Sequence, residues 1–162
     1  MKGKKLLVSL LAAVVLVAVM VTPVMAATST EITGTVLKAI EVSAPAGFGM
    51  SLNPTSSPTT SPVQKATVNA NHAGWTLTVV ESGGDGNMSG TPGTLTNAME
   101  IDGGDLPDYT ALSGTPVTLE DGGDSVAGTT DIDDIYFQQA VEWGDAAGSY
   151  SITVTFTASP SS

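Results

Sequence analysis

Three copies of the tripeptide Gly-Gly-Asp carry the residue types best suited to bind a metal ion. They occupy residues 83–85, 103–105 and 122–124, so successive copies start 20 and 19 residues apart. Glycine supplies the positive φ angles that tight turns need, and carboxylate oxygens are the ligands that calcium prefers. Because two strands and two turns fill about 20 residues, we expect the three turns to cluster at one end of the fold, opposite the breaks at residues 90–93 and 113–116.

Calcium is the one cofactor that these acidic turns suggest. Its predicted ligands are Asp102, Asp105, Asp121 and Asp124. The alternative is that the turns are solvated hairpin ends, since no segment has the twelve-residue EF-hand pattern with its bidentate glutamate.

Residues that could support catalysis are scarce. The chain has one histidine, His72, no cysteine, and no serine in a nucleophile-elbow pattern. Two carboxylates suffice for glycoside hydrolysis, but two tryptophans, three tyrosines and three phenylalanines leave few aromatic rings to line a sugar cleft. We therefore predict that the protein is not an enzyme, and that His72 is a surface residue.

The two tryptophans lie in different sequence surroundings. Trp75 begins an alternating segment and is expected in the core. Trp143 stands beside Gly144 and Asp145, and is therefore the candidate for an exposed residue that stacks on a sugar or contacts a partner, as is Tyr136. Packing at the core or its rim is the alternative for Trp143.

The elements that must position these residues are strands, because apolar and polar residues alternate with a period of two. The alternation is clearest over residues 150–158, 75–79 and 32–42, and further strands are expected near residues 63–69, 95–101, 116–120 and 135–143. Residues 51–62 contain three prolines and predict a surface loop or crossover. The pattern predicts an all-β fold: a single antiparallel β-sandwich of Greek-key, immunoglobulin-like type with about 7–9 strands, or else a small barrel.

The N-terminus has the three parts of a secretory signal. Lys2, Lys4 and Lys5 precede an apolar run over residues 6–21, which ends in small residues up to Ala26. We predict a signal peptide over residues 1–26 and a β-sandwich domain over residues 27–162; an uncleaved anchor is the alternative. The exported chain would keep 2 lysines against 16 acids, a net charge of −14, which disfavours nucleic acid and anionic membranes as partners.

Two segments carry a resemblance to a known family. Residues 74–79, Gly-Trp-Thr-Leu-Thr-Val, and the late strand over residues 150–160 resemble the two signature regions of WxL-type prokaryotic cell-surface proteins. Where that family has a second Trp-x-Leu, this chain has Phe156-Thr157-Ala158. The resemblance implies a surface β-sandwich that associates non-covalently with the cell wall.

We predict a secreted structural or interaction protein of the prokaryotic cell surface, either a wall-associated module or a subunit of an extracellular filament or layer. Its partners would be a cell-wall polymer or copies of itself. Residues 27–42 could pair with an open sheet edge of a neighbouring subunit, with Ile32 and Val36 as partner-binding residues and Trp143 as a further contact. The simpler interpretation is that this segment is the first strand of its own sandwich. A calcium-assisted carbohydrate-binding module is the alternative function.

Overall fold

The computed structural model describes residues 31–55, 57–122 and 126–161. The predicted signal peptide, residues 1–26, and the predicted ligand Asp124 lie outside the described residues. The chain divides into two units, Met1–Thr35 and Val36–Ser162, and every strand belongs to the second. The described part contains no helix and forms antiparallel sheets, which confirms the all-β fold. Nothing in the described ranges forms a helix with the length and apolar character needed to cross a membrane.

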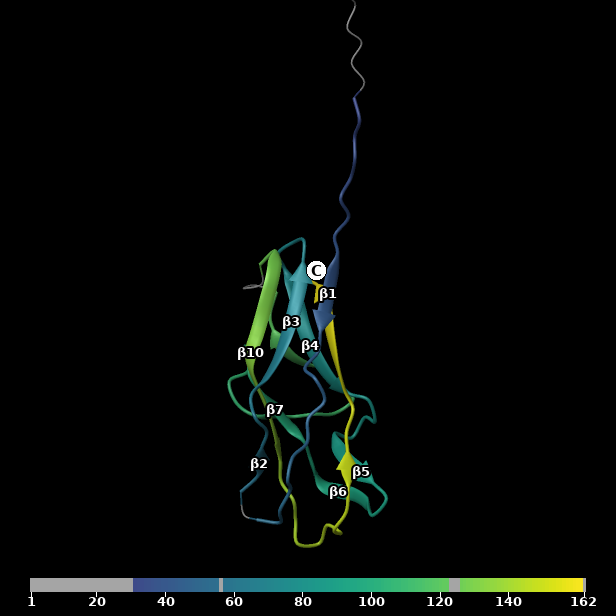
Figure 1. The fold of residues 1–162 in the computed structure, drawn as a ribbon, viewed down its shortest axis with the longest axis vertical. Coiled ribbons are helices and arrows are strands. Elements are labelled where there is room, and N and C mark those ends of the chain that lie inside the picture. The colour runs from purple at the N-terminus through teal and green to yellow at the C-terminus, as the bar shows by residue number, and fades with distance from the viewer. Residues whose placement is uncertain (1–30, 56, 123–125, 162) are drawn as a thin grey trace, which may run out of the picture. The chain divides into compact units, whose positions relative to one another are not determined.

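The strands form three antiparallel sheets (Figure 1). The first sheet has the order β1 (Ile40–Ser43), β3 (Gln64–Ala70), β10 (Gly128–Gln139), β7 (Glu100–Asp102) and β8 (Thr110–Ala111), and β2 (Thr59–Thr60) also pairs with β10. The second sheet has the order β12 (Val154–Pro160), β4 (Trp75–Glu81) and β9 (Val117–Glu120). The third consists of β11 (Tyr150–Ser151), β5 (Asn87–Gly90) and β6 (Gly93–Ala98). The predicted sandwich had fewer strands and no third sheet.

The core joins the first two sheets through one face of each strand. Along β4, Trp75, Leu77 and Val79 are fully buried while the threonines between them are partly exposed, as the alternation predicts. The indole N–H of Trp75 donates to the carbonyl oxygen of Val126 at 3.0 Å, so its polar atom is satisfied. The other buried apolar residues of this core are Ala66, Val68, Ala70, Met99, Ile101, Leu112, Leu119, Ile132, Ile135, Phe137 and Phe156.

The predicted strands near residues 63–69 and 116–120 are confirmed as β3 and β9. The prediction for residues 135–143 was wrong at both ends, since β10 runs from Gly128 to Gln139. The first half of β10 was not predicted because the alternation of apolar and polar residues is interrupted there. Asp133 and Asp134 separate two inward-facing isoleucines, and a β-bulge between Ile132 and Ile135 restores the apolar face.

Two other predicted strands are divided. Residues 95–101 form β6 and β7 with a break at Met99, whose N–H donates to the carbonyl oxygen of Gly86 at 2.8 Å. Residues 150–158 form β11 and β12 around a break at residues 152–153, although the alternation of exposure continues through it. The backbone of Met99 thus bonds outside its own sheet, which a local pattern of side chains does not show, whereas Thr153 still accepts the N–H of Ser82 next to β4.

Candidate functional site

The segment that precedes β1 exposes apolar side chains. Ile32, Val36 and Leu37 are 91%, 87% and 78% exposed. Residues 31–39, called the arm below, are in no strand, so the predicted strand over residues 32–42 is correct only from Ile40 onward. Three apolar side chains exposed within six residues are candidates for an interaction surface. The simpler prediction, that this segment is a strand of its own sheet, therefore holds for β1 but not for the arm.

Asn71, in the turn between β3 and β4, holds the point where the arm joins the domain. Its side-chain Nδ2 donates to the carbonyl oxygen of Leu37 at 2.7 Å, and its Oδ1 accepts the N–H of Ala39 at 2.8 Å. Its backbone N–H also donates to the carbonyl oxygen of Ala39 at 3.2 Å. His72 is half-buried next to it, with Nδ1 3.4 Å from Asn71 Oδ1, rather than fully on the surface. Asn71 thereby fixes the start of β1.

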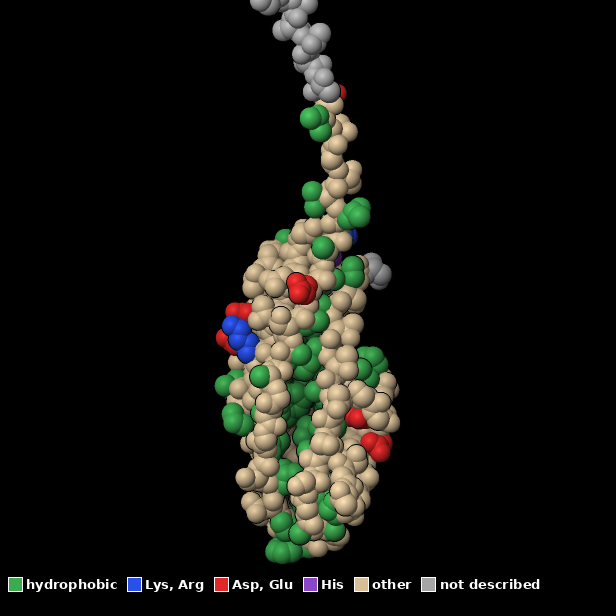
Figure 2. All heavy atoms as spheres, turned by 45° about the vertical axis from the view of Figure 1, so that its right-hand side comes forward, with side chains coloured by type: hydrophobic (Ala, Val, Ile, Leu, Met, Phe, Trp, Pro, Cys, Tyr) green, Lys and Arg blue, Asp and Glu red, His purple; other side chains and the backbone are tan. Residues whose placement is uncertain are grey.

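An apolar groove lies in the domain between residues 44–54, which follow β1, and residues 145–154, which lead into β12. Its volume is about 730 Å³, within the range of concave binding sites. Figure 2 shows apolar side chains lining the hollow between two ridges of backbone and polar atoms. The side chains that make it apolar are Phe48, Met50, Leu52, Met88, Leu95, Met99, Phe137, Ile152, Val154 and Phe156.

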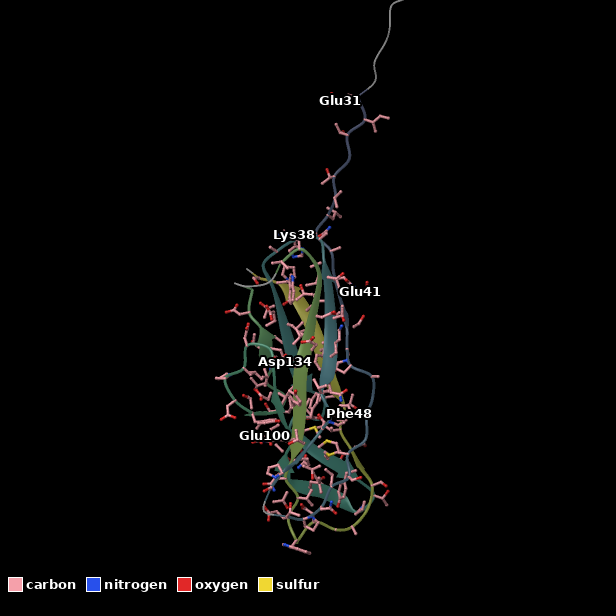
Figure 3. The ribbon with its side chains drawn as sticks, turned by 60° about the vertical axis from the view of Figure 1, so that its left-hand side comes forward. Glu31, Lys38, Glu41, Phe48, Glu100 and Asp134 are labelled. Carbon is pink, nitrogen blue, oxygen red and sulfur yellow. The ribbon has the colours of Figure 1, made fainter. Side chains whose placement is uncertain are left out.

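Aromatic and thioether side chains meet at one wall of the groove. The rings of Phe48 and Phe137 lie with centroids 5.4 Å apart at an angle of 40°, although Phe48 remains 39% exposed. Figure 3 shows Phe48 in the lower half of the domain, near the sulfur atoms of methionine side chains. Methionine adapts its shape to different occupants, so a wall of this kind suits a flexible apolar ligand or segment.

Both walls have backbone groups without partners. Residues 44–54 make no backbone hydrogen bond to the rest of the described chain, yet the side chains of Met50, Leu52 and Pro54 are partly buried and alternate with exposed ones. On the other wall, β12 is an edge strand, paired only with β4 among the described strands. The two extended segments that flank the groove therefore lack a hydrogen-bonded neighbour on the side facing it, although β1 packs beside β12.

The described residues that line the groove include no pair of free carboxylates. Asp145 is the only acid among the described residues that line it. Its Oδ1 accepts the N–H and the hydroxyl of Thr96 at 3.0 and 2.8 Å, and its Oδ2 accepts the N–H of Glu142 at 2.8 Å. The hydrogen bonds from Glu142 and Thr96 lower the pKa of Asp145 and keep it ionised. Asp145 thus organises the loop that forms this wall.

Trp143, in the same loop, is 85% exposed, so the alternative of core or rim packing is wrong for this residue. Tyr136, the other aromatic candidate, is half-buried in β10. A large exposed indole suits stacking on a sugar ring or contact with a partner.

The first acidic turn binds its own neighbour, Glu81. This carboxylate is 6% exposed and accepts the backbone N–H groups of Gly83, of Gly84 at 2.5 Å and of Gly86 at 3.2 Å. The Gly83 N–H, with those of Gly86 and Gly84, lowers the pKa of Glu81 although burial acts in the opposite direction. The turn is thus an internal anion cradle, and sequence reasoning did not identify Glu81.

The expectation that the three acidic turns cluster is wrong. The first turn follows the Glu81 end of β4, whereas Gly122 of the third packs against Thr76 and Ser161 at the other end. The break at residues 113–116 does not lie opposite the first turn but contacts it, since the Gly114 N–H donates to the carbonyl oxygen of Gly84 at 3.0 Å.

The second and third turns do come together. Asp105 Oδ2 accepts the N–H of Asp121 at 2.8 Å, and Asp102 Oδ1 accepts the N–H of Gly103 at 2.9 Å. Among the described residues no group of three or more His, Cys, Asp and Glu side chains is arranged to hold a metal ion. Since Asp124 lies outside those residues, calcium binding by this set stays a prediction.

Sequence reasoning missed the groove. Phe48, Met50 and Leu52 do alternate with small or polar residues, which is a strand signal, but Pro54 and the prolines after it favoured a loop. The comparisons add no relative, because no family model matches the sequence and no curated protein matches it.

Proposed function

We propose that this protein is a secreted structural subunit of the prokaryotic cell surface that assembles through its N-terminal arm into a filament or layer. The observation that carries the proposal is the arm itself, which exposes Ile32, Val36 and Leu37 ahead of an all-β domain. An extended apolar segment can add a strand to an unpaired sheet edge, where main-chain hydrogen bonds provide affinity and side-chain pockets provide specificity.

Other features favour this role over catalysis or nucleic-acid binding. The signal-like residues 1–26 support export, and the net charge of −11 opposes binding to polyanions. The described groove offers one carboxylate, Asp145, whose oxygens are already bonded. The resemblance to WxL-type proteins supports attachment to a cell-wall polymer as a second partner, alongside copies of the chain.

The test measures assembly of the full chain, expressed with its own N-terminal segment in a prokaryotic host, by size-exclusion chromatography with light scattering over a range of concentrations. Mass spectrometry of the purified chain identifies its N-terminus. We expect concentration-dependent polymers that are lost in the double variant Ile32→Asp/Val36→Asp. The matched control, Thr33→Asp/Thr35→Asp, adds the same charge at neighbouring positions and should retain assembly. A monomer at every concentration would refute the proposal.

A carbohydrate-binding module is the second candidate, because Trp143 is 85% exposed at a loop edge. We expect Trp143→Ala to abolish retention on insoluble cell-wall polysaccharide while leaving the urea-unfolding curve unchanged, since a surface truncation costs within about 0.5 kcal/mol. The control Tyr109→Ala changes another partly exposed aromatic residue away from this loop. Equal retention of wild type and Trp143→Ala would remove this candidate.

A further inference from the structure

We infer that the apolar groove of one copy receives the arm of a second copy as an added β-strand along β12. The inference rests on the proposed assembly and identifies where the arm binds. Three observations on the domain carry it: the backbone groups that β12 leaves unpaired, the side-chain pattern shared by arm and groove, and the ends of the domain at which the arm leaves and the groove opens.

The register of β12 shows which backbone groups face the groove. Just beyond the two ends of the β12–β4 ladder, the Ser82 N–H donates to the carbonyl oxygen of Thr153 at 3.0 Å, and the Ser161 N–H donates to that of Gly74 at 2.8 Å. In an antiparallel pair these bonds alternate along the strand, so the odd-numbered residues bond to β4. The N–H and C=O groups of Val154 and Phe156, which line the groove, therefore point away from β4, while β1 also lies beside β12.

The apolar side chains of the arm match the groove in spacing. In an extended arm Ile32, Gly34 and Val36 lie on one face, while Thr33 and Thr35 lie on the other. On β12, the side chains that face the groove are apolar and those on the opposite face are Thr155 and Thr157. An added arm would thus bury its apolar face against Met50, Leu52 and Ile152 and extend the exposed threonine row.

The direction of the added strand follows from where the arm leaves the domain. The arm joins β1 beside Ala70, at the same end of the domain as the Pro160–Trp75 pair. The groove lies toward the other end, where Val154 pairs with Glu81. An arm antiparallel to β12, the more stable pairing, reaches the groove from the Val154 end. Each subunit then contacts the next head to tail, and such a contact extends as a filament where the rotation between subunits does not close into a ring.

Asn71 bonds to Leu37 and Ala39, so the base of the arm is fixed to the β3–β4 turn. Whether the groove holds the arm of a second copy or the chain's own arm is decided by the double-cysteine variant described below.

Disulfide trapping tests the location of the arm, because the chain contains no cysteine and introduced thiols have no competing partners. Thr35→Cys and Thr155→Cys are made in separate full-length chains, one of them labelled with nitrogen-15, and the chains are mixed and oxidised. Both positions lie on the predicted solvent face, so the groove contacts remain. With Thr35 directly opposite Thr155, their Cα atoms would be about 4.5–5.5 Å apart, within the roughly 4.4–6.8 Å separation of a disulfide. We expect a labelled–unlabelled crosslinked pair to be the main product.

The matched control is Thr118→Cys, an exposed threonine on β9 at the opposite edge of the same sheet. Crosslinking of Thr35→Cys to Thr118→Cys as efficiently as to Thr155→Cys would overturn the groove assignment. If Ile32→Asp/Val36→Asp still abolished polymers, the proposed assembly would stand and only its acceptor would change. If no crosslink and no polymer formed, both would fail.

A double variant, Thr35→Cys/Thr155→Cys, distinguishes a second copy from the chain's own arm. We expect crosslinked oligomers at concentrations where the wild type assembles. A crosslinked monomer as the main product would overturn the inference, since the arm would then occupy its own groove. Loss of crosslinking on addition of an apolar molecule such as a fatty acid, with polymers unchanged, would assign the groove to a small ligand instead.

Discussion

The side-chain Nδ2 of Asn71 donates a hydrogen bond of 2.7 Å to the carbonyl oxygen of Leu37, which lies 34 residues earlier in the chain. The same side chain accepts the N–H of Ala39, so one residue of the β3–β4 turn holds two backbone groups where the arm meets β1. A side chain that bonds both a donor and an acceptor of another segment acts as a local clamp.

Removing this clamp should loosen the start of β1 without unfolding the domain. We expect Asn71→Ala to speed amide hydrogen exchange at residues 37–40, because the N–H of Ala39 loses its side-chain acceptor. The control is Asn69→Ala, which removes an exposed asparagine that bonds to Thr129 instead. Hydrogen-exchange mass spectrometry of both variants is the measurement. Equal exchange at residues 37–40 in both variants would contradict the clamp.

Glu81 should make the domain acid-sensitive. Its pKa is lowered in the folded state by the backbone N–H groups of Gly83, Gly86 and Gly84, so the folded state binds its proton less readily than the unfolded state does. Its stabilisation is therefore fully present above the unfolded pKa, whose ordinary value is 4.5, and is lost as the pH falls through the lower, folded pKa.

We expect Glu81→Gln to reduce the free energy of unfolding by roughly 1–3 kcal/mol at pH 7, because the new amide N–H₂ would face N–H donors. The difference from wild type should shrink as the pH is lowered below 4.5. Urea unfolding at several pH values provides the measurement, and Asp133→Asn, which changes an exposed acid, is the control. A difference that is constant with pH would show that the charge of Glu81 contributes nothing.

Gly86 and Gly74 offer a matched test of whether the backbone of Leu112 packs closely against residue 86. Their φ angles are +75° and +74°, so replacement by alanine imposes the same backbone strain, of order 1–2 kcal/mol. A Cβ at residue 86 would lie 1.9 Å from the carbonyl oxygen of Leu112, whereas a Cβ at residue 74 would meet nothing within 4 Å. We expect Gly86→Ala to lose at least about 1–3 kcal/mol more than Gly74→Ala in urea unfolding. Equal losses of unfolding free energy in the two variants would argue against close packing of Leu112 on residue 86.

Calcium at the second and third acidic turns remains a prediction with a direct thermal test. A ligand at 100 times its Kd stabilises the folded state by about 2.7 kcal/mol, so millimolar calcium should raise the Tm relative to EDTA. Asp121→Asn should reduce that rise if the residue is a ligand, and magnesium at the same concentration controls for ionic strength. A Tm that is equal in calcium and EDTA would end the metal hypothesis.

Local alternation made much of the fold predictable. Strands near residues 63–69, 75–79 and 116–120 were predicted, and Trp75 was placed in the core, because each side-chain sequence by itself shows which face is buried. The exposed arm residues Ile32 and Val36 were also chosen from sequence, although the strand predicted around them begins only at Ile40. A period-two pattern reports where a strand is possible, not whether a partner is present to pair with it.

The sequence alone thus determined the all-β class and which residues of most strands face the core, because these depend on neighbours along the chain. Tertiary structure decided which turns meet, since Asp105 reaches Asp121 while the first turn binds Glu81 at the other end of β4. It also decided that residues 44–54 remain unpaired opposite β12 and form a groove. Strand pairing and its absence depend on backbone hydrogen bonds between segments far apart in sequence, and no local pattern of side chains specifies them.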